Sequence, residues 1–153
     1  MLPTPTRYSL VSGVAEGQTP LTAFDRALLA AGIGNLNLLK VSSILPPGAV
    51  YVSQLTIPPG SLLPVAYAAM TSATPGDLIA AAVAVGRGDP EEYGVIMETS
   101  GHFTRQEIEA HIKAMVEEAF ATRQKCLVRV EVAAVAHQVE RLGCVLAAVP
   151  LWY

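Results

Sequence analysis

The sequence predicts an α+β fold in which strands occur in runs and two helices stand apart from them. The chain has 153 residues, enough for one domain (1–153) with its own hydrophobic core. Short apolar segments bounded by glycine, proline or aspartate recur along it, and two segments carry helix-start signals. Runs of strands with segregated helices favour two sheet layers covered by two helices. The predicted elements are strands over 7–15, 36–44, 61–72, 77–87, 92–101, 126–137 and 143–153, and helices over 20–31 and 104–124.

The first helix has clear signals at both ends. Thr19 is a favourable N-cap residue, and Pro20 suits the first helical position because its ring presets the backbone. Gly32 and Gly34 are expected to end the helix, since glycine adopts a left-handed backbone at no steric cost. The strand predicted over 36–44 follows directly.

The remaining elements follow from periodicity and turn residues. The segment 77–87 is alanine-rich, so propensity alone also allows a helix, but its neighbours favour a strand. Thr104 and Glu107 form a capping box ahead of an apolar stripe at helical spacing. The segment 126–137 alternates charged and apolar residues, as a half-buried strand does.

Composition excludes several function classes. The net charge is −3 and no Lys/Arg run carries interleaved aromatics, so nucleic acid is not an expected partner. The longest apolar stretch is interrupted by Pro64, Pro75 and Asp77, so no membrane association is expected. Two cysteines and no signal-peptide pattern favour a cytoplasmic location. Only 15% of residues are charged, against roughly 25% in an average domain, which favours oligomerisation.

Two carboxylates do not fit simple packing. On a helical wheel Asp25 falls within the apolar arc of the first helix, so it either pairs with a cation such as Arg7 or Arg129, or faces a cavity. Glu98 shares a strand face with Ile96, and desolvation there favours the protonated form that a proton donor requires. The alternative for Glu98 is that the strand simply reaches the surface. The three histidines share no ligand spacing, so no metal is expected.

A resemblance gives these residues a context. The block VSSILPP (residues 41–47), the upstream GIGNLN (32–37), GVIMETSG (94–101) and the closing ERLGCVLAAVPLWY (140–153) are similar to the pyruvoyl-dependent arginine decarboxylase family, nearly end to end. The resemblance implies a four-layer αββα sandwich and a homotrimer of cleaved protomers. It also implies that the chain cuts itself between Ser42 and Ser43, giving a β chain of residues 1–42 and an α chain of residues 43–153.

The resemblance also assigns roles. Ser43 becomes a covalent pyruvoyl group, which removes the need for pyridoxal phosphate, and the Ser43 hydroxyl is essential because it attacks the Ser42 carbonyl. Asn37 is expected to stabilise the resulting oxyanion, reaching it across a bend or from a neighbouring chain. Glu98 is the expected proton donor and Asp25 the expected partner of the substrate guanidinium. The implied reaction converts arginine to agmatine and CO₂, toward polyamines or to consume protons against acid.

Two alternatives stay open at this level. A related pyruvoyl enzyme acting on another amino acid, such as histidine, needs Ser43 and Glu98 but not a guanidinium-selecting Asp25. An unprocessed oligomeric binding protein needs none of this chemistry, and in it the Ser42–Ser43 pair is an ordinary turn. Substrate turnover separates the first alternative, and an intact backbone at Ser43 identifies the second.

Overall fold

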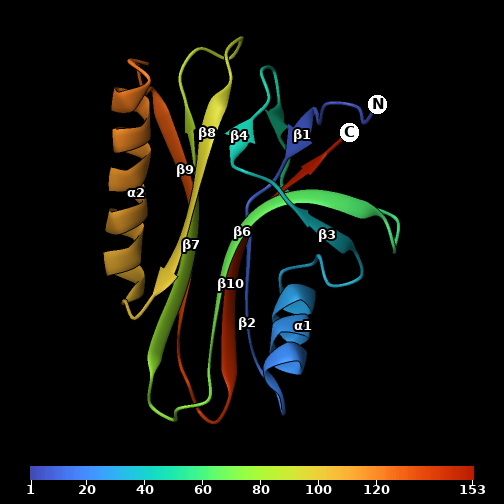
Figure 1. Cartoon of the computed structure of the whole chain (residues 1–153), viewed down its shortest axis with the longest axis vertical. Coiled ribbons are helices and arrows are strands. Elements are labelled where there is room, and N and C mark those ends of the chain that lie inside the picture. The colour runs from blue at the N-terminus through green and yellow to red at the C-terminus, as the bar shows by residue number, and fades with distance from the viewer.

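The computed structural model describes all 153 residues and has four layers in the order helix, sheet, sheet, helix (Figure 1). Helix α1 spans Pro20–Ala30 and helix α2 spans Arg105–Thr122. The strands are β1 (Arg7–Tyr8), β2 (Val11–Glu16), β3 (Asn37–Lys40), β4 (Ile44–Leu45), β5 (Val50–Tyr51), β6 (Leu62–Ser72), β7 (Leu78–Arg87), β8 (Gly94–Gly101), β9 (Arg129–Gln138) and β10 (Gly143–Trp152). The predicted α+β sandwich covered by two helices is confirmed.

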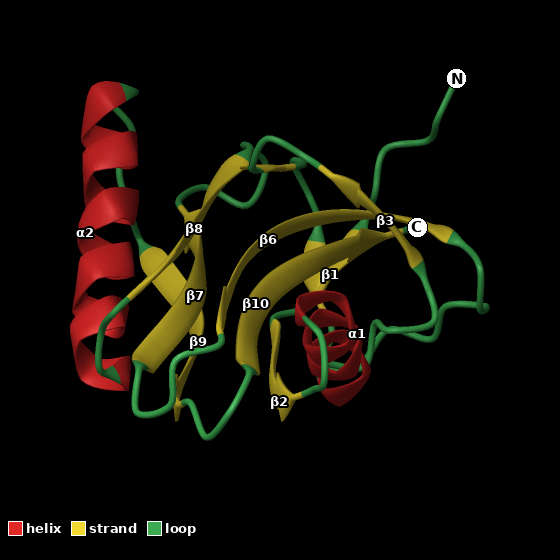
Figure 2. Cartoon of the chain, turned by 60° about the horizontal axis from the view of Figure 1, so that its bottom comes forward, coloured by secondary structure: helices red, strands yellow, loops and turns green.

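The two sheets differ in size and in the helix that covers them. The larger sheet has the strand order β3-β6-β10-β1-β5, with β2 also paired to β10. The smaller sheet has the order β4-β8-β7-β9. Helix α1 packs on the larger sheet and α2 on the smaller one, as Figure 2 shows from a second direction. A core that includes Ile79, Val83 and Val145 fills the space between the sheets.

The strand predicted over 7–15 is interrupted at residues 9 and 10. Both pieces keep one register against β10, since Tyr8 faces Leu151 and Val11 faces Ala148. The gap lies opposite Pro150, which accepts a hydrogen bond from the Ser9 N–H at 3.2 Å. Proline has no N–H to donate in return, so the ladder loses one bond at this point. The interruption is therefore a property of β10 that the residues of 7–15 do not reveal.

The prediction of one strand over 36–44 is wrong, because the segment forms two strands in different sheets. Its first part is β3, which runs parallel to β6 in the larger sheet. Its end is β4, which pairs with β8 in the smaller sheet. The chain therefore crosses from one sheet to the other between residues 41 and 43, and the serine pair lies in that crossing.

Helix α1 buries only part of the face that its leucines predict, since Leu28 is buried but Leu21 and Leu29 are not. Leu21 is 74% exposed and Leu29 is 50% exposed, whereas Ala23 and Ala27 are fully buried. The reason is a close approach to β2: a Cβ added at Gly13 would lie 2.1 Å from the Ala27 carbonyl oxygen. The helix packs through small residues because its backbone lies directly on the sheet. Asp25, between the two leucines, is consequently exposed.

The other helix and the alanine-rich strand match their predictions. Thr104 and Glu107 form the expected capping box at the start of α2. The segment Leu78–Arg87 is a strand, and it is buried on both faces because α2 covers one side and the larger sheet the other. Gly32 ends α1 with a φ of 81°. Gly34 does not have a positive φ; a side chain at this position would collide with Leu29. Neither helix is long and apolar enough to cross a membrane.

Candidate active site

Ser43, the second residue of the serine pair, has an unusual backbone conformation. Ser43 has a φ of 80°, in the left-handed region that non-glycine residues rarely occupy. Only one other non-glycine residue, Gln124, shares this feature. Holding a residue there costs of order 1–3 kcal/mol, so the surrounding structure must impose it. The crossing between the sheets thus places conformational strain at the predicted cleavage position.

Ser43 and Glu98 are in direct contact although 55 residues separate them. The Ser43 hydroxyl donates to both carboxylate oxygens of Glu98, at 3.0 Å and 2.8 Å. Glu98 lies in β8, and both side chains are half-buried. No other hydrogen bond or ion pair involves the Glu98 carboxylate. The two residues predicted to carry the chemistry are therefore brought together within one chain.

The segment after the serine pair is held by β8. The Ile96 N–H donates to the Ser43 carbonyl at 2.8 Å. Ile44 and Leu45 then pair with Val95 and Gly94. Sequence reasoning did not identify this backbone contact, because it depends on the strand pairing and not on residue type.

Asn37 does not reach the serine pair within its own chain. Its side-chain amide donates to the Gly60 carbonyl at 2.8 Å, at the start of β3. At about 3.3 Å per residue, the four-residue advance along the strand puts roughly 13 Å between Asn37 and Val41. Of the two routes open to Asn37, a bend within the chain is not observed.

Asp25 makes no ion pair, which removes the interpretation as a core-edge salt bridge. The Arg7 guanidinium donates to the Tyr153 carbonyl, and Arg129 pairs with Glu131 at 3.3 Å. Asp25 lies on the exposed face of α1, within the stripe that includes Leu21 and Leu29. The prediction that helix packing buries Asp25 within one chain is wrong, because the alanine face takes that position.

Neither of the two main cavities is lined by Ser43 or Glu98. A cavity of about 400 Å³ lies between the end of α1 and the segment 53–59, and Leu29 forms part of its wall. No group of three or more His, Cys, Asp and Glu side chains is arranged to hold a metal ion.

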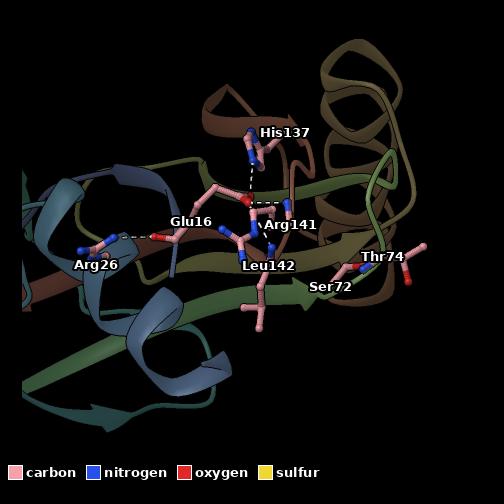
Figure 3. Close-up of polar contacts among 7 residues, drawn as sticks. All are labelled: Glu16, Arg26, Ser72, Thr74, His137, Arg141 and Leu142. Carbon is pink, nitrogen blue, oxygen red and sulfur yellow. Dashed lines mark hydrogen bonds and ion pairs between the residues drawn. The ribbon is translucent and has the colours of Figure 1, made fainter. Parts of the chain in front are cut away.

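A polar cluster that the sequence did not reveal joins β2 to the turn between β9 and β10 (Figure 3). The Glu16 carboxylate accepts hydrogen bonds from the backbone N–H groups of Arg141 at 2.8 Å and Leu142 at 3.1 Å. It also contacts His137 Nε2 at 2.8 Å. Desolvation opposes ionisation, but these donors outweigh it and hold the pKa of Glu16 below its usual value. Every partner is more than 120 residues away, so no local pattern indicates the cluster.

A second missed cluster lies between the sheets, where the Tyr8 hydroxyl donates to Glu131. Burial, reinforced by the hydrogen bond to this carboxylate, raises the pKa of Tyr8 to about 12, although Arg87 donates to the same hydroxyl at 3.1 Å. The phenol is therefore neutral and fixed. These contacts join β1 to β7 and β9 of the smaller sheet.

Comparison with known proteins places these observations in a family. The sequence profile described as pyruvoyl-dependent arginine decarboxylase matches residues 7–153. A protein of that name from Methanocaldococcus jannaschii is 47% identical over 150 residues, covering 97% of this chain and 91% of its own. The protein of that name from Methanococcus maripaludis is 41% identical over 150 residues, covering 97% of this chain and 92% of its own. The one from Thermococcus sibiricus is 46% identical over 122 residues, covering 78% of this chain and 77% of its own.

Proposed function

Since the chain belongs to the pyruvoyl-dependent arginine decarboxylase family, we propose that it converts L-arginine to agmatine and CO₂ with a pyruvoyl group made from its own Ser43. The observation that carries this proposal is the contact between the Ser43 hydroxyl and the Glu98 carboxylate at a residue with a φ of 80°. Nucleophile, base and backbone strain coincide at one position. An ordinary turn requires none of these features.

Formation of the group would begin in the uncut chain. Glu98 accepts the hydroxyl proton as the Ser43 Oγ attacks the Ser42 carbonyl carbon. The peptide C–N bond breaks, an ester replaces it, and the amine of residue 43 is freed. Loss of the Cα proton of residue 43 expels the Ser42 carboxylate and leaves dehydroalanine. One water then supplies the keto oxygen as ammonia is released. Breaking the peptide bond also relaxes the strain at Ser43.

The residues around Ser43 fit a group formed there. When present, the pyruvoyl group would serve as the electron sink for decarboxylation. Glu98 lies one hydrogen bond from the side chain of the residue that carries it, so we assign this carboxyl group the return of a proton to the substrate Cα. The same residue thus acts as base during maturation and as acid during turnover.

The two remaining site residues would come from a neighbouring protomer. Asn37 and Asp25 both lie away from the crossing, on β3 and α1. Apolar side chains flank them: Leu39 is 43% exposed and Leu21 is 74% exposed. Exposed leucines beside exposed polar side chains support an interface between protomers at this surface. In a homotrimer, Asn37 would donate to the Ser42 carbonyl and Asp25 would hold the substrate guanidinium.

The free cysteines, Cys126 and Cys144, agree with a cytoplasmic location.

An intact-mass measurement of the denatured protein tests the proposal. We expect two fragments, 1–42 and 43–153, with a ketone on the larger one that borohydride reduces. Ser43→Ala should give a single uncut chain of about the full 16.1 kDa without activity. Ser42→Ala is the matched control: it keeps the scissile carbonyl and should still be cut. Cleavage or activity of Ser43→Ala would overturn the proposal, and turnover of histidine in preference to arginine would reassign the substrate.

A further inference from the structure

Cleavage between Ser42 and Ser43 would turn the reactive residue into a chain end. Free ends fray unless backbone contacts hold them, and small misplacements of a reacting group are costly in rate. The question is therefore what fixes residues 43–49 after the cut. This question rests on the proposed function.

Strand β4 is too short to hold the new end by itself. It contributes only Ile44 and Leu45, paired with the start of β8. The next anchor is a hydrogen bond at 3.1 Å from the Gly48 N–H to the Pro90 carbonyl, in the loop 88–93 between β7 and β8. Because the same loop leads into β8, its position sets both partners of the segment 43–49.

The loop 88–93 is in turn held from the end of α2. Lys125 Nζ lies 4.0 Å from the ring centroid of Tyr93 and pairs with the Glu92 carboxylate. Its side chain is only 12% exposed, which favours the contact with the ring, whereas Glu92 is 57% exposed and the ion pair stays open to solvent. The backbone also approaches closely here: a Cβ at Gly88 would lie 2.5 Å from the Cys126 carbonyl oxygen. The loop therefore sits on residues 125 and 126 with little freedom.

The turn before Lys125 is itself constrained to present this side chain. Gln124 has a φ of 53°, and Gln124 and Ser43 are the only non-glycine residues with a left-handed backbone conformation. Its N–H donates to the Ala121 carbonyl at 3.0 Å, and the Lys125 N–H donates to the Phe120 carbonyl at 3.0 Å. This pair of bonds is the Schellman ending of a helix, normally made with glycine. It turns the chain back so that Lys125 meets the loop.

We propose that Lys125 is a positioning residue for the pyruvoyl end: through Tyr93 and Glu92 it fixes the loop 88–93, and through Pro90 and β8 it fixes the segment that begins at Ser43. The residue contacts neither Ser43 nor Glu98, so its effect is transmitted through this loop. Its loss leaves the reacting groups present but loosely placed, which lowers the rate of chemistry without removing the arginine-binding residues.

The test compares Lys125→Met with Lys113→Met, an exposed lysine of α2 with no ion pair, and with Lys125→Arg, which keeps the charge and the ring contact. Two rates are measured: the appearance of fragment 43–153, and kcat per ketone counted by borohydride reduction. We expect Lys125→Met to lower both by about tenfold with KM nearly unchanged, within the range that displaced reacting groups cause. Lys113→Met should match the parent chain and Lys125→Arg should recover most of the loss.

A second variant keeps the test decisive if Lys125→Met folds poorly. Tyr93→Leu removes the ring contact from the loop side and should produce the same pattern. Unchanged maturation and kcat in both variants, or a change confined to KM or to thermal stability, would overturn the positioning role. A parent chain that is never cut would instead overturn the proposed function, so the two failures are distinguishable.

Discussion

Glu16 and Glu98 are two partly buried carboxylates whose surroundings differ in one respect. Glu16 accepts from two backbone N–H groups and contacts His137, so both its oxygens are used by fixed partners. Glu98 accepts only from the Ser43 hydroxyl, which approaches both oxygens. Several fixed donors favour the ionised form of a carboxylate, and for Glu16 they outweigh desolvation and lower the pKa. Glu16 is thus tied to the turn before β10, whereas the one partner of Glu98 is the residue from which we propose that the pyruvoyl group is made.

Asp25 differs from both, because it is exposed and makes no ion pair. It lies on the 1–42 segment, as does Asn37, whereas Ser43 and Glu98 lie on the 43–153 segment. One chain therefore brings Ser43 and Glu98 into contact and leaves Asn37 and Asp25, for which we propose roles in a neighbouring protomer's site, at its surface. The three carboxylates should consequently respond to substitution in three different ways.

The largest effect is expected for Glu98→Gln. The amide cannot accept the Ser43 hydroxyl proton or return one to the substrate, so both maturation and turnover should fall by about 10²–10⁴-fold. The measurement is the rate of fragment formation, followed by kcat per reducible ketone. Glu117→Gln, on the exposed side of α2, serves as the control and should behave like the parent chain. Normal maturation of Glu98→Gln would show that another group deprotonates Ser43.

A smaller and more selective effect is expected for Asp25→Asn. The substitution removes one charge-assisted pair with the guanidinium, worth about 1.5–3 kcal/mol, and should raise the KM for arginine by roughly 10–150-fold. Maturation should proceed at the normal rate, because Asp25 does not contact the serine pair. The informative quantity is this split between KM and maturation. An unchanged KM would leave Asp25 a structural residue of α1.

The sequence indicated which residues to examine better than it indicated their positions. Ser43 and Glu98 were identified through motifs, and the structure brings them together. The exposed position of Asp25 could not be predicted, because the helical wheel ranks leucines above alanines while Gly13 makes the alanine face the one that fits. The crossing at residues 41–43 was missed for a similar reason. Local apolarity continues through it, and only the pairing with β6 and β8 shows that the strand changes sheets.

The same limit applies to long-range polar contacts. The partners of Glu16 lie 121 to 126 residues further along the chain, and the interruption near Ser9 is caused by Pro150. No periodic pattern in the sequence around Glu16 or around Ser9 indicates these contacts. Capping boxes and turn glycines, which act within four residues, were predicted correctly at Thr104 and Gly32. Local chemistry is readable from one segment, whereas the contacts that distinguish Glu16 from Glu98 are not.

The smallest effect, and the one that completes the comparison, is expected for Glu16→Gln. Folding lowers the pKa of Glu16 from its ordinary value of 4.5, so its contribution to stability is complete above that value and is lost as pH falls through the lowered one. In the uncut Ser43→Ala chain, Glu16→Gln should lower Tm by a few degrees near neutral pH. The difference should shrink as the pH falls through the lowered pKa, because Glu16 itself then becomes neutral. In the chain with Ser43 intact, maturation and kcat should not change. A Tm difference independent of pH would mean that shape, and not charge, makes Glu16 fit its turn.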